Sequence, residues 1–392
     1  MRATVMTTVK NIAILVQLSR PYDREVLAGI AQFVQSRPNW RVYIEEEPGD
    51  KVPSFAQWSG DGMIIDLDDS RIAKLVNQFD GPIVGIGTPP LVMRKRLGIS
   101  TVRTDDEMIA HWAADHLIGR GLQEFAYCGM RTRGLDRWAE LRRDAFEHRI
   151  RAQGYRCAVF SGRLYSPRRW NQMLDQLAGW IERLPKPVGL MACNDVRGRH
   201  VFEACRKLEL RIPEDVVVVG VDNDELMCEL TVPPLSSIAQ DAERIGYEAA
   251  RLLGKHLSKR GQRATHIVVP PKCVVTRGST DLVAIEDDIV ANAVRYIRER
   301  ATEVIGVPDV VRHVGVSRST LENRFRERLS RTVHGEILRE RIGRARRMMA
   351  TTDLPQHTIA KRAGFSSVHY MSAVFRREFG QTPGNMRRLH KS

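Results

Sequence analysis

Short apolar runs alternate with amphipathic helical patterns through the first two thirds of the chain. Runs of consecutive apolar residues predict buried strands, and apolar residues recurring every three or four positions predict helices. The strands are expected at 12–18, 41–45, 62–65, 83–87, 124–129, 156–160, 187–193 and 216–221, and the helices at 24–36, 106–120, 136–153 and 195–208. This alternation is typical of an α/β fold whose parallel sheets have helices on both faces. The pattern changes near 101–107, which suggests two lobes within one domain at 9–276.

The last quarter of the chain shows a different pattern, which is helical throughout. A short apolar helix over 358–363 ends at Gly364, whose freedom to adopt a positive φ suits a helix C-cap. Ser366 is the expected N-cap of the next helix, which places Tyr370, Met371, Val374 and Phe375 on one face. Helix, tight turn and short basic helix predict a helix-turn-helix that inserts its second helix into a DNA major groove. An ordinary helical hairpin is the alternative.

A second copy of this unit lies upstream, at 307–328. It again contains a short helix that ends at a glycine, Gly315, followed by a serine N-cap at Ser317. One long helix over 333–350 separates the two copies, and it should pack against both through the stripe Ile337, Leu338, Ile342, Ala345, Met348 and Met349. The repetition favours two helix-turn-helix units over a chance hairpin.

These ordered motifs resemble the DNA-binding domain of the AraC/XylS family of transcription regulators. The resemblance rests on Leu338, Arg341, Ile342 and Ala345 in the long helix, and on Ile359, Ala360, Gly364, Phe365, Phe375, Gly380, Thr382, Pro383 and Arg387 after it. The family usually has Phe where Met371 stands, and a thioether fills a similar core site. The resemblance implies an all-α domain with two helix-turn-helix units, placed at 289–390.

Charge supports the assignment of DNA binding to the C-terminal end. The chain has a net charge of +14, and residues 283–392 contain 21 Lys and Arg against 12 Asp and Glu. Basic residues are therefore concentrated in the segment that would neutralise phosphates. Hydrophobic residues at 43% and charged residues at 28% describe a globular protein.

The cysteines, the apolar runs and the absence of cofactor motifs in the sequence indicate a cytoplasmic protein without a cofactor or metal. The six cysteines are scattered and include no CxxC pair, which is typical of a reduced compartment (Cys128, Cys157, Cys193, Cys205, Cys228 and Cys273). The first apolar run is short and lacks a cleavage site, so it fits a strand better than a signal peptide. No apolar run is long enough for a membrane span. P-loop, GxGxxG, GxSxG and metal-ligand spacings are also missing, which argues against an enzyme.

Polar side chains follow several of the expected strands. Ligands of parallel α/β folds bind outside the carboxyl ends of strands, so these side chains form the candidate ligand site. They are Tyr22, Asp23, Arg24, Asp66, Asn194, Asp195, Asp222 and Asn223. Helix capping is the alternative role for Asn and Asp at such positions.

Residues 190–238 resemble the effector-binding core of LacI/GalR-type regulators and the related periplasmic sugar-binding proteins. The resemblance rests on 193–195, 212–216, 220–223 and 234–238, together with Arg142, which begins the family's Arg-x-x-Gly-Phe although Ala145 replaces the glycine. It implies a two-lobed, type I periplasmic-binding-protein-like domain whose Arg142, Asn194, Asp195 and Asp222 bind sugar hydroxyls. Carboxylates accept such hydrogens and a guanidinium donates to vicinal oxygens. Alone, Arg142 and Arg143 fit a solvated helix face, and Trp138 fits core better than a sugar-stacking platform. The ordered set of motifs nevertheless favours a sugar site that includes both Arg142 and Trp138.

The order of the domains, sugar domain first and DNA-binding domain last across a linker at 277–288, resembles AraC/XylS-type regulators of xylose use. This resemblance implies D-xylose as the effector, double-stranded promoter DNA and RNA polymerase as partners if the protein is an activator, and a homodimer. Another pentose or a hexose, a repressor, a sugar-binding transport component and a sugar-modifying enzyme are the alternatives.

Base recognition is expected from residues that follow the two serine caps and face away from the apolar stripes. They are Arg318, Ser319, Glu322, Asn323 and Arg328 in the first unit, and Ser367, Val368, His369, Ser372, Arg376 and Arg377 in the second. The first set has more charged and amide groups that reach base edges, so we expect it to supply more of the sequence preference. The second set should act more through phosphate contacts of Arg376 and Arg377.

Overall fold

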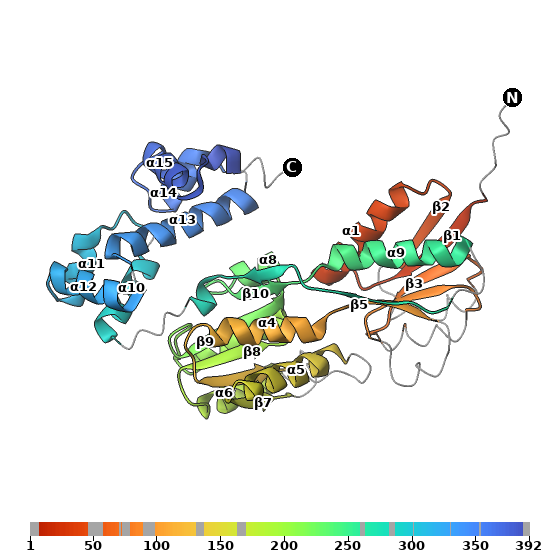
Figure 1. The fold of residues 1–392 in the computed structure, drawn as a ribbon, viewed down its shortest axis with the longest axis horizontal. Coiled ribbons are helices and arrows are strands. Elements are labelled where there is room, and N and C mark those ends of the chain that lie inside the picture. The colour runs from red at the N-terminus through yellow and green to blue at the C-terminus, as the bar shows by residue number, and fades with distance from the viewer. Residues whose placement is uncertain are drawn as a thin grey trace. The chain divides into compact units, whose positions relative to one another are not determined.

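The structure is a computed structural model, and it divides into two compact units, Met1–Leu282 and Val283–Ser392 (Figure 1). It describes residues 8–45, 58–69, 72, 79–88, 99–130, 137–162, 170–258, 263–281, 287–300, 302–329, 331–352 and 354–386. Within the first unit two six-stranded sheets form two lobes, and the second unit is helical in its described residues. The predicted fold class, an α/β two-lobed domain followed by a helical domain, is confirmed.

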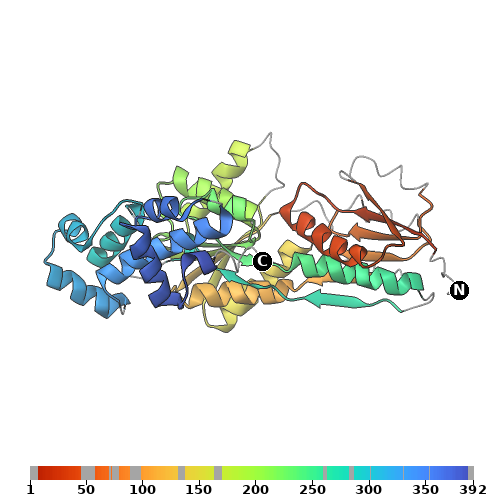
Figure 2. The same cartoon turned by 90° about the horizontal axis from the view of Figure 1, so that it is seen from above.

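The first lobe is a parallel sheet with strand order β11-β5-β4-β3-β1-β2. Its strands are β1 (Lys10–Leu15), β2 (Trp40–Glu45), β3 (Gly62–Asp66), β4 (Ile83–Ile86), β5 (Ser100–Thr104) and β11 (His266–Val269). Helices α1 (Pro21–Gln35) and α9 (Ala242–Ser258) lie side by side on one face, as Figure 1 and Figure 2 show. Their backbones approach closely at Gly29 and Gly246, where an added Cβ would lie 1.8 Å from a carbonyl oxygen of the other helix.

The second lobe has strand order β12-β10-β9-β8-β6-β7, parallel except for β12. Its strands are β6 (Glu124–Cys128), β7 (Arg156–Phe160), β8 (Val188–Ala192), β9 (Val216–Asp222), β10 (Ser236–Ala239) and β12 (Cys273–Val275). Helices α4 (Asp106–Ile118) and α5 (Trp138–Ala152) cover one face, and α6 (Trp170–Glu182) and α7 (Asp195–Lys207) cover the other. Strands β8 and β9 are buried on both faces, which explains their continuous apolar runs.

The lobes are not consecutive halves of the chain, because the chain passes between them at 104–106, 239–242 and 269–273. Neighbouring passages are hydrogen-bonded: Thr104 Oγ1 donates to Gln240 Oε1 at 2.6 Å, and Asp105 N donates to Val269 O at 2.9 Å. The change of pattern near 101–107 is therefore only the first of three crossings. In the first unit, sequence patterns did not predict β5, β10, α6, α9 or the short helix α8 (Glu225–Glu229). The two missed strands, β5 and β10, each end at a crossing.

The predicted linker at 277–288 differs from the structure at its beginning. Arg277, Ser279 and Thr280 are buried, and Gly278–Thr280 forms a short 3-10 helix, η4, that belongs to the first unit. The middle of the predicted linker lies outside the described residues.

The second unit contains two apolar cores bridged by one long helix. Its helices are α10 (Asp288–Glu299), α11 (Val307–Val314), α12 (Arg318–Leu329), α13 (Val333–Thr351), α14 (Gln356–Arg362) and α15 (Val368–Phe379). Ile337 of α13 packs into the first core and Leu338 into the second, as the predicted stripe requires. Met371 is fully buried in the second core. Helix α10, which was not predicted, completes the first core.

The turns of both helix-turn-helix units follow from their glycines and serines. Gly315 and Gly364 have φ of 70° and 78°, which a residue with a Cβ rarely adopts. Ser317 caps α12 by accepting from Thr320 N at 3.1 Å. The predicted cap at Ser366 is wrong by one residue, because Ser367 accepts from Tyr370 N and α15 begins at Val368.

Candidate functional site

Tyr22, Asp23 and Arg24 lie in the first turn of α1 and not in a loop before it. Asp23 is 2% exposed and close to Asp66, which ends β3. Burial and the charge of Asp66 raise the pKa of Asp23 to about 8. Arg24 is exposed, and it donates to Leu18 O, in the loop before α1, at 2.8 Å. The first lobe therefore contributes a buried carboxyl pair to the ends of its strands.

Asn194 and Asp195 follow β8, and their side chains form hydrogen bonds within the protein that hold neighbouring segments in place. Asn194 Oδ1 accepts from Arg197 N at 2.9 Å, so the capping role is correct for this oxygen. Asp195 is buried, and its two carboxylate oxygens accept from Ser237 Oγ at 2.6 Å and Asp224 N at 2.8 Å. One oxygen of Asp195 thus holds β10 through Ser237, and the other holds the loop that follows β9 through Asp224.

Asp222 ends β9 and Asn223 follows it, and both have unusual backbone conformations, with φ of 109° and 56°. Gln240 Nε2 donates to Asp222 Oδ1 at 2.6 Å, which leaves Oδ2 as the second acceptor of the carboxylate. Burial raises the pKa of Asp222 to about 6, and the nearby Arg142 opposes this rise. The structure therefore presents a half-buried acceptor group at the end of the central strand β9.

Arg142 is buried at 4% exposure and is not part of a solvated helix face. Its Nε donates to Asp106 Oδ1 at 2.9 Å and its Nη1 donates to Cys193 O at 2.7 Å. The ring of Trp138 lies 4.8 Å from the Arg142 guanidinium and packs against the core of the lobe, as the core interpretation of this tryptophan expected. Arg143, by contrast, forms a partly exposed ion pair with Asp144.

Charged groups of the two lobes lie near one another at this end of the unit. The charge of Asp222 contributes to the raised pKa of Asp23. The charge of Arg20, in the first lobe, opposes the rise in the pKa of Asp222. The Nη1 atom of Arg20 is also 3.5 Å from Asp66 Oδ2. Carboxylates, guanidinium groups and amides from both lobes form a set of donors and acceptors suited to a neutral polyhydroxyl ligand.

Several neighbours of this set were missed from the sequence: Arg20, Thr104, Asp106, Ser237 and Gln240. Thr104, Asp106 and Gln240 lie at the carboxyl ends of β5 and β10, or just beyond them. The rule that places ligands at strand ends would have included them if β5 and β10 had been predicted.

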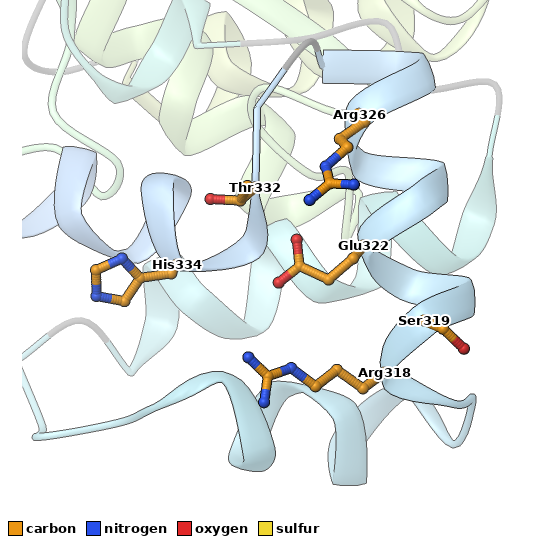
Figure 3. Close-up of a pocket in the computed structure, with 6 residues that line it drawn as sticks. All are labelled: Arg318, Ser319, Glu322, Arg326, Thr332 and His334. Carbon is orange, nitrogen blue, oxygen red and sulfur yellow. The ribbon is translucent and has the colours of Figure 1, made fainter.

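The exposed side of α12 borders a groove of about 660 Å³ in the second unit (Figure 3). Arg318, Glu322 and Arg326 project into it from successive turns of α12, and Thr332 and His334 line it from the start of α13. Glu322 Oε2 also accepts from Val333 N, at 3.4 Å. Among the groove residues, Arg326, Thr332 and His334 were not predicted.

Of the other predicted residues of α12, Ser319 also lines the groove, whereas Asn323 and Arg328 are not among its lining residues. Ser319 points away from the other labelled side chains in Figure 3, and Asn323 and Arg328 are exposed.

The predicted residues of α15 divide by exposure. His369, Arg376 and Arg377 are exposed and Ser372 is half-buried. Ser367 is the helix cap, so its hydroxyl oxygen already accepts a backbone hydrogen bond. Val368 packs against the second core, although the sequence pattern placed it on the opposite side. The outward face of α15 is consequently poorer in base-reading groups than that of α12.

A two-lobed ligand-binding domain joined to paired helix-turn-helix units defines the class: a ligand-responsive transcription regulator. Family models agree, with a periplasmic binding protein-like domain matching 114–280, a helix-turn-helix domain 310–389, and a XylR N-terminal domain 11–107. The chain belongs to the family of xylose operon regulatory proteins.

Relatives with that description cover nearly the whole chain. The xylose operon regulatory protein of Escherichia coli strain K12 is 35% identical over 96% of both chains. The corresponding Haemophilus influenzae protein is 34% identical over 96% of this chain and 98% of its own. A solved structure described as the xylose-binding transcription activator xylR covers 98% of this chain and 99% of its own, with 34% identity and a TM-score of 0.81.

No helix in the described part of the chain is both long and apolar enough to cross a membrane. The described residues also contain no group of three or more His, Cys, Asp or Glu side chains placed to hold a metal ion.

Proposed function

We propose that the protein is a D-xylose-dependent activator of xylose catabolic genes. The hydrogen-bonding groups that both lobes bring together at Asp23, Asp66, Arg142 and Asp222 support a sugar effector. The relatives and the solved neighbour are described as xylose operon regulators and as xylose-binding. Asn194, Asn223 and Tyr22 complete the proposed effector site.

Calorimetry with the intact protein tests this proposal against a panel of pentoses and hexoses. D-xylose should bind most tightly, and Asp222→Ala should weaken binding by roughly 2–4 kcal/mol, because it removes charge-assisted hydrogen bonds. Arg142→Ala should do likewise, with circular dichroism as the check that the fold persists. Tighter binding of a hexose would overturn the choice of sugar, and unchanged affinity in both variants would place the site elsewhere.

DNA is the proposed target of the second unit, through the outward faces of α12 and α15. As an activator on promoter DNA, the protein would act in the cytoplasm as a homodimer and would contact RNA polymerase. It has no enzymatic role in this proposal. Turnover of xylose by the purified protein would contradict it.

A further inference from the structure

Arg277 is a buried arginine that the effector site described above does not use. It is 8% exposed and directly precedes η4, at the end of the first unit. Its Nη2 donates to Asn223 Oδ1 at 2.8 Å, its Nη1 to Leu235 O at 3.0 Å, and its Nε to Glu229 Oε1 at 3.3 Å. All three nitrogens of the guanidinium thus donate to the segment between β9 and β10.

The contact with Asn223 determines which way the amide of that residue faces. A guanidinium group has only donors, so the amide oxygen must face Arg277. The NH₂ group of Asn223 then remains as a donor for a ligand. The left-handed backbone of Asn223, whose N donates to Ser237 Oγ at 3.0 Å, holds the residue in this position.

The residues after Arg277 are fixed to the same lobe by buried hydrogen bonds. Arg277 N donates to Ser236 Oγ at 2.7 Å, and Ser279 Oγ donates to Val218 O at 2.6 Å. Thr280 Oγ1 lies 2.7 Å from Ser236 Oγ and 2.9 Å from His116 Nε2. The segment that leads toward the DNA-binding unit therefore starts from a rigid attachment beside Asn223.

We infer that Arg277 is a positioning residue that orients Asn223 for the sugar and couples the occupied site to the segment leading to the DNA-binding unit. The inference rests on the proposed effector site. Sugar that engages the Asn223 amide acts on a group that Arg277 holds directly. A change there is transmitted to the residues that enter the second unit.

A double-mutant cycle on the intact protein tests the orienting role. Arg277→Gln should lower xylose affinity at least 10-fold when it is the single substitution, but by less than about 3-fold in an Asn223→Ala background. The reason is that both substitutions act through the side-chain amide of Asn223. A purely structural role would lower affinity equally in both backgrounds and would overturn the inference. Arg211→Gln, which removes an exposed arginine paired with Asp215, is the matched control and should leave xylose affinity unchanged.

Asn223→Asp keeps the test decisive if Arg277→Gln does not fold. The aspartate retains an acceptor for Arg277 and should preserve thermal stability, but it lacks the NH₂ donor. Xylose affinity should fall at least 10-fold, and unchanged affinity would overturn the orientation. If the unaltered protein binds no sugar, the proposed function fails, whereas normal binding with an additive cycle refutes only the role of Arg277.

The coupling is measured as the ratio of promoter affinities with and without saturating xylose. This ratio should move toward 1 in Arg277→Gln and stay unchanged in Arg211→Gln. A normal ratio in Arg277→Gln at saturating sugar would refute the coupling role.

Discussion

At the scale of single residues, the first lobe buries a carboxyl group, Asp23, beside a second one. Asp23 is 2% exposed, Asp66 is 4% exposed, and Oδ2 of Asp23 has no hydrogen-bond partner in the described structure. When two adjacent carboxyl groups are removed from water, ionising both of them costs free energy, because the charges repel and lose their hydration. The raised pKa of Asp23 is the consequence, and it links the stability of this lobe to pH.

Asp23→Asn should flatten this pH dependence in the absence of sugar. The pKa of Asp23 is about 8 in the folded chain against 3.8 in an unfolded one, so folding retains a proton between these values. Stability contributed by this group is present below about pH 4 and is lost as pH rises toward 8, with a limiting slope of about 1.4 kcal/mol per pH unit. Thermal unfolding from about pH 5 to 8 should show a steeper decline in the unaltered protein than in the variant. Parallel curves would contradict the assignment.

Arg197 is a further buried charge, which lies on α7 at 1% exposure. Its Nη1 is 3.4 Å from the sulfur of Met173, while its Nε and Nη2 make no hydrogen bond within the described structure. Arg197→Met should raise the free energy of unfolding by about 1–4 kcal/mol, because a buried charge whose hydrogen bonding within the described residues is limited to a thioether costs more than an apolar side chain of similar length. Denaturant unfolding measures this change, with Arg211→Met as an exposed control. A loss of stability in Arg197→Met would show that the charge is compensated.

At the scale of elements, the two recognition helices offer different chemistry. Helix α12 exposes Arg318, Asn323 and Arg326 along its length, whereas α15 follows a capping serine and begins with a partly buried Val368. Side chains with two or more hydrogen-bonding groups distinguish base pairs in the major groove. We therefore expect α12 to supply most of the base preference.

Asn323→Ala should relax the preference at one or two base pairs by about 1–3 kcal/mol. Arg376→Ala should instead weaken binding to all sequences alike and flatten its dependence on salt, because it removes a phosphate contact. Binding-site selection and salt titrations on each variant distinguish these effects. A selection in which the half contacted by α15 shows the stronger base preferences would refute the assignment.

At the scale of the whole molecule, the two units have separate cores. The chain leaves the first unit shortly after the largely buried segment 277–280. The first unit contains the proposed sugar site and the second contains two cores of its own around α13. We expect the three chain crossings between the lobes of the first unit to act as a hinge, because sugar-dependent closure of such a hinge is a common way to change a regulator's state.

A fragment containing residues 283–392 should bind promoter DNA without any response to xylose. The intact protein should bind the same DNA with an affinity that depends on xylose, since only it contains both sites. Electrophoretic mobility shifts over a range of xylose concentrations measure the difference. DNA affinity of the intact protein that is the same at every sugar concentration would contradict the coupling.

Local patterns in the sequence were sufficient for the class of fold and for the two helix-turn-helix units. Glycines at positive φ, serine caps and apolar spacing act within a few residues of one another, so Gly315, Gly364 and the α13 stripe could be predicted. The error at Ser366 has the same origin, because two adjacent serines offer the same capping hydroxyl and the backbone decides between them.

What only the tertiary structure decided is which distant residues meet. The sequence placed Asp195 at a strand end, but its two carboxylate oxygens bond Ser237 and Asp224, so it supports the site. The sequence did not predict that Arg277 contacts Asn223, which is 54 positions away. It also did not predict that α9 and β11 belong to the first lobe. Apolar periodicity records whether a residue is buried, whereas the partner of a buried polar group depends on how the sheets and crossings assemble.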